Sequence, residues 1–258
     1  IDNVDGVDIT LVHEKEHRAV LIMRGENLGV DVAETDPQVV GMKAIEPETS
    51  CEGSERTAKV VKTFLERVDD ILADESVANA FLIRGFGIHS GYSTFGERYG
   101  LSALAIAKYP MYRGVAKLVG MEIASTPSSN EDTVKTLESS FGSHDFYFLH
   151  FKDTDTRGHD EDFEGKMAAI EEIDAMLPRI MDLNPDVLVI TGDHATPTLL
   201  GEHSWHHVPT MIHSKWTRPS ADTFGETTCR TGDLGVIKGI DLMPLVLAHA
   251  LRLNKYGA

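Results

Sequence analysis

Five acidic and imidazole side chains in the sequence are of the types that bind divalent metal ions. They follow two β-rich runs, residues 146–151 and 187–191, at short spacings along the chain. The candidate ligands are Asp155, His159, Asp193, His194 and His203. Carboxylates supply charge and can bridge two ions, and imidazoles supply a neutral, directional nitrogen. This combination suits Mn²⁺ or Zn²⁺, so the pattern predicts a metal centre.

The spacing of the candidate ligands also allows two neighbouring ions. Asp155 and His159 can chelate one ion from a single loop, whereas the adjacent Asp193 and His194 point in opposite directions on an extended backbone. Two such ions can clamp the attacking and leaving oxygens of a phosphoryl transfer. Taken singly, an Asp-x-x-x-His pair is common, Asp193 could be a helix N-cap, and His203 could lie in a solvated loop. The prediction rests on three clusters that follow strands in a consistent order.

From about residue 100 onward, the segments that must position these side chains alternate between strands and helices. We expect a strand or helix start at 101–108 and strands at 121–124, 146–151, 187–191 and 210–212. We expect helices at 112–119, 131–141, 164–177 and 242–253. This alternation is typical of an α/β fold with a doubly wound, mostly parallel sheet. Functional residues then lie just beyond the C-terminal ends of the strands.

The first hundred residues show a different pattern and predict a second, smaller α+β domain. Strands at 8–12 and 19–23 are separated by a charged segment, as in a hairpin. Apolar residues recur at helical spacing over 52–73, with Ser54 as a candidate N-cap, and 80–84 is a short apolar strand. We place the domain boundary between residues 98 and 99, which gives the ranges 1–98 and 99–258.

Composition limits the partners of this protein. A net charge of −17 argues against nucleic acid, although a local basic or metal cluster could still bind a small anion. No apolar run reaches the length that spans a membrane. Cys51 and Cys229 fit no metal or redox spacing, which favours a reducing, cytoplasmic setting.

Short motifs in a fixed order resemble the archaeal-type 2,3-bisphosphoglycerate-independent phosphoglycerate mutases, which belong to the alkaline phosphatase superfamily. The motifs of the second domain are Lys152-x-x-Asp155-x-x-Gly158-His159-Asp160, Thr191-Gly192-Asp193-His194-Ala195-Thr196-Pro197, His203-Ser204, Val208-Pro209 and Gly235-x-x-x-Gly239-x-Asp241. Those upstream are His17-Arg18-Ala19, Thr35-Asp36-Pro37, Leu82-x-Arg84-Gly85 and Tyr99-Gly100-Leu101. The resemblance covers nearly the whole chain.

The resemblance implies two divalent ions, with Mn²⁺ as the expected metal and Zn²⁺ or Mg²⁺ as alternatives. It assigns Asp155, His159 and His203 to one ion, and Asp193 and His194 to the other. It also implies that 1–98 is part of an inserted substrate-binding domain.

In that domain we expect His17, Arg18 and Arg84 to contact the substrate, because Arg suits bidentate recognition of phosphate or carboxylate. A surface ion pair is the alternative for Arg18. Lys152 could hold a phosphate or pair with Asp153.

The implied reaction moves phosphate between the 3- and 2-positions of glycerate through a phosphoserine-type intermediate. Relatives carry an Asp-Gly metal-binding turn and a nucleophilic Ser or Thr upstream of the segment matched here. We therefore expect both domains to be incomplete and the chain alone to be inactive. The alternatives are a metal-dependent phosphatase or phosphonate hydrolase of the same superfamily, or a non-catalytic metal-binding domain. The motifs His17-Arg18 and Asp36-Pro37 favour the mutase.

Overall fold

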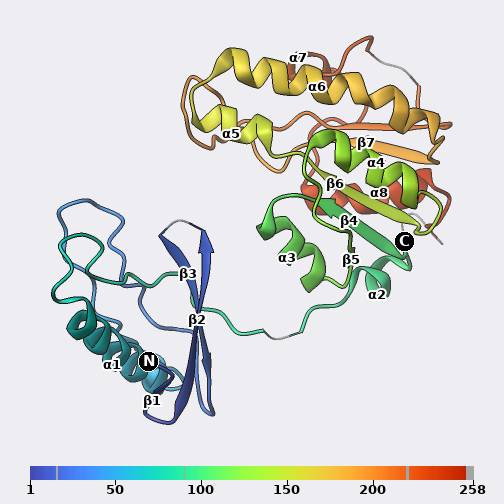
Figure 1. Ribbon diagram of the computed structural model, residues 1–258. Coiled ribbons are helices and arrows are strands. Elements are labelled where there is room, and N and C mark those ends of the chain that lie inside the picture. The colour runs from blue at the N-terminus through green and yellow to red at the C-terminus, as the bar shows by residue number, and fades with distance from the viewer. Residues whose placement is uncertain (16, 90, 219–220, 254–258) are drawn as a thin grey trace. The chain divides into compact units, whose positions relative to one another are not determined.

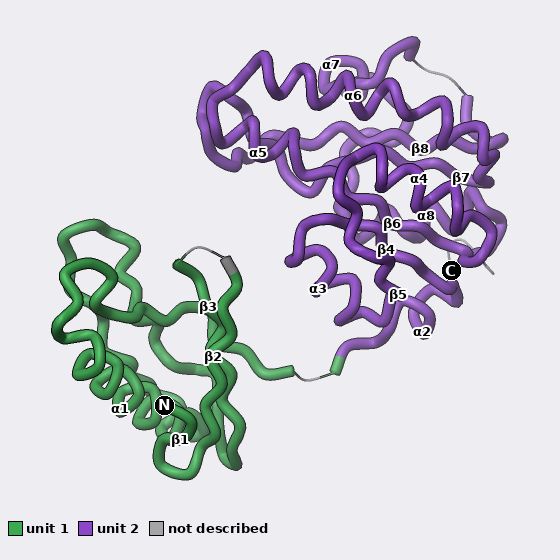
Figure 2. Tube along the Cα trace, viewed as in Figure 1, with its two compact units in different colours: residues 1–91 green, residues 92–258 purple. Residues whose placement is uncertain are grey.

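A computed structural model describes residues 1–15, 17–89, 91–218 and 221–253 of the protein (Figure 1). The chain divides into two compact units, Ile1–Gly91 and Tyr92–Ala258 (Figure 2). This division lies earlier in the chain than the domain boundary predicted from the sequence, which is between residues 98 and 99. The reason is that Phe95 is buried in one cluster with Leu101 and Leu247 of the second unit.

Unit 1 is a small antiparallel sheet covered by one helix. The strands, in spatial order, are β1 (Asn3–Val4), β2 (Val7–Lys15) and β3 (Arg18–Arg24), and the helix is α1 (Glu55–Leu72). Phe64 and Val68, spaced one helical turn apart, are buried with Val7 of the sheet. The predicted hairpin and helix are confirmed. Ser54 lies at the N-cap position, but its Oγ accepts from the N–H of Asp31 at 3.1 Å and not from the helix.

The strand predicted at 80–84 is wrong. Residues 80–84 have no neighbouring strand with which to form a ladder among the described residues. Instead, the Ile83 N–H donates to Thr35 Oγ1 at 2.7 Å, and the Ile83 carbonyl accepts from the Thr35 N–H at 2.9 Å. The backbone N–H and carbonyl of Ile83 therefore form their hydrogen bonds with a loop residue instead of a strand, which the apolar composition of 80–84 could not indicate.

Unit 2 is built on a parallel sheet with the strand order β5 (Glu122–Ile123), β4 (Ala103–Ala107) and β6 (Phe146–His150). Every residue of β4 is buried, as expected for the central strand of a sheet covered on both faces. The α-helices in the described part of this unit are α2 (Phe95–Tyr99), α3 (Pro110–Leu118), α4 (Asn130–Ser140), α5 (Asp153–His159), α6 (Phe163–Asp182), α7 (Glu226–Cys229) and α8 (Leu242–His249), and a short 3-10 helix, η1 (Gly239–Asp241), precedes α8.

Side chains alternate along β4, so this apolar strand has an apolar surface on each face of the sheet. Helices cover both faces and bury these surfaces. Ile106 packs with Val134 of α4 and Ile180 of α6 on one face. Ala103 packs with Leu247 of α8 on the other. The predicted α/β fold with a parallel sheet is thus confirmed.

Two further strands, β7 (Val187–Ile190) and β8 (Met211–Ser214), pair in antiparallel fashion. The long connection between them carries three of the candidate ligands. Its two arms are held together by a bridge in which the Ser204 N–H donates to the Ala195 carbonyl at 2.9 Å. Over the described ranges, no helix combines the length and apolar character needed to cross a bilayer.

Arg179 ties helix α6 to helix α4 through two carboxylates. Its guanidinium donates to both carboxylate oxygens of Glu138, at 2.8 and 2.7 Å, and to Glu131 at 2.7 Å. The bidentate contact with Glu138 is the arrangement that guanidinium and carboxylate groups favour. Hydrogen bonding from Arg179 lowers the pKa of both glutamates below their ordinary value.

Replacing Arg179 with Met should therefore lower the melting temperature near neutral pH by a small amount, because the ion pairs are partly exposed. A carboxyl group whose pKa is lowered by folding stabilises the fold above its unfolded pKa, here an ordinary value of 4.5. That contribution is lost as the pH falls through the lower, folded pKa. The melting-temperature difference between wild type and variant should shrink below pH 4.5, as followed by circular dichroism. A difference independent of pH would contradict this account.

Candidate metal centre

Helix α5 places the first two candidate ligands side by side. The loop expected after β6 is in fact this short helix, which begins at Asp153 and ends at His159. Asp155 and His159 are four residues apart, so the helix presents them on one face, a single turn from each other. The acidic residues in its first turn also stabilise this helix, because the backbone N–H groups at a helix N-terminus carry partial positive charge.

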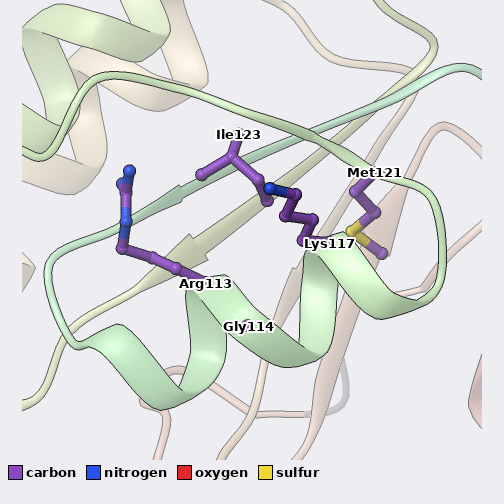
Figure 3. Close-up of a pocket in the computed structure, with 5 residues that line it drawn as sticks. All are labelled: Arg113, Gly114, Lys117, Met121 and Ile123. Atoms are coloured by element: carbon purple, nitrogen blue, oxygen red, sulfur yellow. The ribbon is translucent and has the colours of Figure 1, made fainter. Parts of the chain in front are cut away.

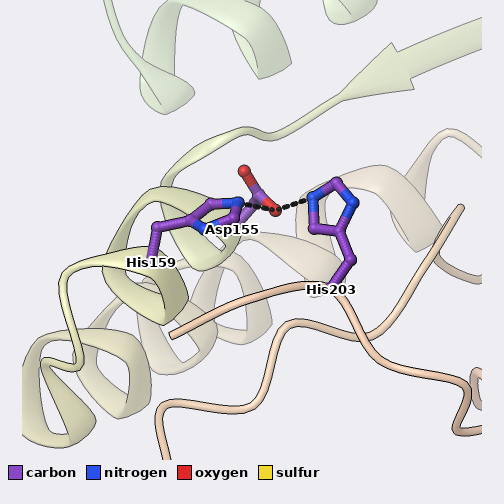
Figure 4. Close-up of side chains that lie close together, drawn as sticks. All are labelled: Asp155, His159 and His203. Carbon is purple, nitrogen blue, oxygen red and sulfur yellow. Dashed lines mark ion pairs between the residues drawn. The ribbon is translucent and has the colours of Figure 1, made fainter. Parts of the chain in front are cut away.

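Three imidazoles converge on one oxygen of Asp155. The Nε2 atoms of His159, His194 and His203 each lie 3.6 Å from Asp155 Oδ1. Asp155, His159 and His203 form a group whose potential ligand atoms all lie within 4.8 Å of one another (Figure 4). The Asp155 side chain is only 13% exposed, whereas that of His203 is 56% exposed. The carboxylate is thus the most buried member of the cluster, and the imidazoles are more exposed to solvent.

Asp193 lies at the edge of this cluster. Its Oδ2 is 3.5 Å from His194 Nε2, so His194 stands between the two carboxylates. The rings of His194 and His203 are stacked with centroids 3.7 Å apart. The structure therefore brings all five candidate ligands into one region, arranged as a group of three that His194 links to Asp193.

Hydrogen bonds decide which imidazole nitrogens remain available. His159 Nδ1 lies 2.8 Å from the Gly201 carbonyl oxygen, which can only accept. In the neutral ring, Nδ1 must therefore carry the proton, and the Nε2 lone pair faces Asp155. His194 Nδ1 is likewise 3.0 Å from Thr196 Oγ1. Metal-binding histidines commonly donate their second N–H in this way, so the donor set fits a divalent cation.

Both carboxylates are held in the ionised form that binds cations. Burial acts to raise the pKa of Asp155, but hydrogen bonds from Lys152 and Thr196, together with the positive charge of Lys152, contribute to a net lowering below its ordinary value. Burial likewise acts to raise the pKa of Asp193, and the hydrogen bond from Tyr112 contributes to a net lowering. The pKa of Tyr112 is raised, first by its own burial and then by its bond to Asp193.

Lys152 pairs with Asp155 and not with Asp153, the partner considered from the sequence. Its ammonium contacts Asp155 Oδ2, the oxygen turned away from the imidazoles, and lies 5.1 Å from the centroid of the Tyr109 ring. Asp153 instead accepts from Asn130 Nδ2 at 2.9 Å. The two oxygens of Asp155 thus have different neighbours: Oδ2 contacts the Lys152 ammonium, and Oδ1 faces the three imidazoles.

Sequence reasoning missed Tyr112 as part of this centre. Its hydroxyl donates to Asp193 Oδ2, and its ring stacks on His150 with centroids 3.7 Å apart. Tyr112 lies on α3, which follows β4, whereas Asp193 follows β7. No local spacing joins two residues so far apart in the chain. Thr196 was included only as part of a motif, with no role of its own.

Gly158 is required where helix α5 meets the 191–210 connection. A Cβ added at Gly158 would lie 2.4 Å from the Thr196 carbonyl oxygen, closer than real carbon–oxygen contacts allow. The obstacle is backbone and cannot rotate away. The absence of a side chain at this position therefore lets Asp155 and Thr196 approach each other.

Replacing Gly158 with Ala should destabilise the protein by about 1–3 kcal/mol, the usual cost of overpacking. It should also weaken metal binding, because Thr196 is pushed away from Asp155. The matched control is Gly114→Ala on α3, where an added Cβ meets no atom within 4 Å. That helical substitution should stabilise the protein by roughly 0.5–1 kcal/mol. Urea unfolding measures both effects, and equal stability of the two variants would contradict the steric argument.

The predicted substrate-binding residues belong to unit 1. His17 and Arg18 are exposed at the turn between β2 and β3. Arg84 lies outside any strand and pairs with Glu34 and Asp36, each at 3.7 Å, while its side chain stays 54% exposed. Arg84 therefore keeps room for an added anion, and a substrate role for these three residues stays a prediction.

A separate hollow of about 390 Å³ lies along α3 (Figure 3). Its lining includes Arg113 and Lys117 but none of the candidate ligands. The Arg113 guanidinium donates to the carbonyl of Ala107, the last residue of β4, at 3.1 Å and to that of Ala124, just after β5, at 3.0 Å. This arginine thus anchors α3, the helix that carries Tyr112.

Comparison with known proteins places the chain among metalloenzymes and finds relatives named as phosphoglycerate mutases. The family model described as Metalloenzyme superfamily matches residues 87–249, and that of 2,3-bisphosphoglycerate-independent phosphoglycerate mutase matches residues 1–78. The chain is 46% identical over 259 residues to a protein of Thermotoga sp. (strain RQ2) and 43% identical over 262 residues to one of Thermus thermophilus. Both carry the name probable 2,3-bisphosphoglycerate-independent phosphoglycerate mutase. The alignments cover 100% of this chain but only 65% and 64% of these relatives, so the chain spans just under two thirds of their length.

Two solved structures are similar to the chain. The PH0037 protein from Pyrococcus horikoshii matches with a TM-score of 0.64 and 31% identity, covering 75% of this chain and 66% of that one. The cofactor-independent phosphoglycerate mutase from Thermoplasma acidophilum matches with a TM-score of 0.68 over 96% of this chain and 67% of that one. At 22% identity, this second likeness concerns the fold alone. The predicted resemblance to the independent phosphoglycerate mutases is confirmed by the relatives. Because the metalloenzyme family model covers more than half of the chain, the chain belongs to the metalloenzyme superfamily, whose members use divalent metal ions.

Proposed function

We propose that this chain is part of a phosphoglycerate mutase. This enzyme is an isomerase that interconverts 3-phosphoglycerate and 2-phosphoglycerate in glycolysis and gluconeogenesis. The observation that carries the proposal is the match of residues 1–78 to the mutase family model, next to a metalloenzyme segment at 87–249. A general metal-dependent phosphatase needs the second segment but not the first. The proposed setting is the cytoplasm, where glycolytic substrates are found.

The cluster around Asp155 is the proposed metal centre. Asp155, His159 and His203 are assigned to one ion, and Asp193 and His194 to a second, with Mn²⁺ as the expected metal. When bound, such ions favour the deprotonated form of a nearby hydroxyl and offset the negative charge that develops on the phosphoryl oxygens. The convergence of three Nε2 atoms on one carboxylate oxygen supports a metal centre at this place, and the contact of His194 with Asp193 supports pairing these two residues.

The protein's own groups prepare this centre for an anionic substrate. Lys152 places a fixed positive charge on the far oxygen of Asp155, and Tyr112 holds Asp193 through its hydroxyl. The reaction is a transfer of the phosphoryl group to a Ser or Thr hydroxyl and back to the other glycerate oxygen. No residue of this chain is assigned as that nucleophile. His17, Arg18 and Arg84 are proposed to hold the phosphate or carboxylate of the substrate.

An assay of the complete gene product tests this function. After incubation with Mn²⁺ and without 2,3-bisphosphoglycerate, it should convert 3-phosphoglycerate to 2-phosphoglycerate, as detected by coupling to enolase. EDTA should abolish turnover, and added Mn²⁺ should restore it. Release of inorganic phosphate without isomerisation would instead identify a phosphatase. Absence of any turnover in a product that binds Mn²⁺ would identify a non-catalytic metal-binding protein.

A further inference from the structure

Thr196 lies at the junction between the two groups of candidate ligands. Its side chain is buried, with only 4% of the residue exposed. Its Oγ1 is 2.8 Å from Asp155 Oδ1 and 3.0 Å from His194 Nδ1. One hydroxyl thus contacts a candidate ligand of each proposed ion.

The direction of these two hydrogen bonds follows from the number of protons available. A hydroxyl has one hydrogen to donate, and an ionised carboxylate can only accept. The Thr196 hydroxyl therefore donates to Asp155, and it must accept from His194. This requires the proton of the neutral His194 ring to be on Nδ1, which leaves the Nε2 lone pair facing Asp155 and Asp193.

The position of Thr196 is set by its surroundings within unit 2. Its carbonyl oxygen accepts from Lys166 Nζ of helix α6 at 2.5 Å. The same carbonyl packs against Gly158 of helix α5, where no side chain intervenes. Branching at Cβ further restricts the Thr196 hydroxyl to few rotamers. The hydroxyl is therefore held in place by groups that are not themselves candidate ligands.

We propose that Thr196 is a positioning residue that orients Asp155 and fixes the tautomer of His194 through one continuous chain of hydrogen bonds. Loss of its hydroxyl then disturbs both ligand groups at once. The inference rests on the proposed metal centre and adds a residue to it. Partners of metal ligands typically contribute about 10–100-fold to metal affinity.

A matched pair of variants tests this role in the 258-residue chain. Thr196→Val keeps the shape but lacks the hydroxyl, and Thr196→Ser keeps the hydroxyl but lacks the methyl group. By isothermal titration with Mn²⁺, the Val variant should bind roughly 10–100-fold more weakly than wild type, and the Ser variant should stay close to wild type. Val binding equal to wild type, or Ser binding as weak as Val, would overturn the proposal.

The tautomer supplies a second readout that needs no metal. Nitrogen-15 NMR of the metal-free wild-type chain should show the His194 proton on Nδ1, and the Thr196→Val variant should lose this preference. A wild-type His194 ring protonated on Nε2 would also overturn the role of Thr196. Wild-type protein with the expected tautomer but no Mn²⁺ binding would instead count against the metal centre itself.

Discussion

Replacing Asp155 with Asn is expected to lower the Mn²⁺ affinity of the centre beyond the upper end of the roughly 10–100-fold range typical of lost second-sphere partners. The amide has nearly the shape of the carboxylate but no charge, and one of its ends is an NH₂ donor. Lys152 occupies the Oδ2 side and requires an acceptor there. The NH₂ group is therefore directed toward the Oδ1 side, where three imidazole Nε2 atoms converge. A donor at that point opposes a cation.

The control for this variant is Asp153→Asn on the same helix. This substitution removes the same charge from a residue only two positions away. The Asp153 carboxylate accepts a hydrogen bond from Asn130, whereas the three imidazoles lie next to Asp155. Mn²⁺ affinity should change by no more than a few-fold, since only an exposed charge near the site is lost. Isothermal titration measures both variants. If Asp155→Asn bound Mn²⁺ as tightly as wild type, the carboxylate would not be the focus of the centre.

Replacing Ile106 with Ala is expected to destabilise unit 2 by about 2–5 kcal/mol. Ile106 is fully buried in β4, the central strand, and packs with Val134 and Leu137 of α4 and Ile180 of α6. The cost combines the lost transfer of apolar surface with a cavity that a sheet between two helix layers cannot close. Urea unfolding should show the change in the transition of unit 2, with that of unit 1 unaltered.

Ile170→Ala on helix α6 is the matched control. Ile170 is 52% exposed, so its truncation should change stability by no more than about 0.5 kcal/mol. The comparison separates burial from residue type, because both variants remove the same atoms. Equal losses of stability from the two substitutions would contradict the placement of β4 at the centre of the sheet.

The sequence by itself determined the fold class and the candidate ligands. Strands and helices alternate with distinct periodicities, so β6, α4 and α6 were predictable from local pattern, whereas the segment of β4 was left open between a strand and a helix start. The candidate ligands were found because each cluster follows a strand, and the C-terminal ends of strands in an α/β sheet carry functional residues. Helix α1 was predictable for the same reason, since its apolar stripe repeats at helical spacing.

Only the tertiary structure decided the contacts that bring these candidate ligands together. Helix α5 has a polar sequence without an apolar stripe, so its helical form was not apparent from periodicity. The partner of Lys152, the antiparallel pairing of β7 with β8, and the loop contacts of 80–84 also depend on the folded arrangement. Tyr112 and Asp193 are 81 positions apart, and Thr196 and Asp155 are 41 apart. Sequence periodicity reports on neighbours within a turn or along a strand, whereas contacts at such separations are set by the order in which strands and helices pack.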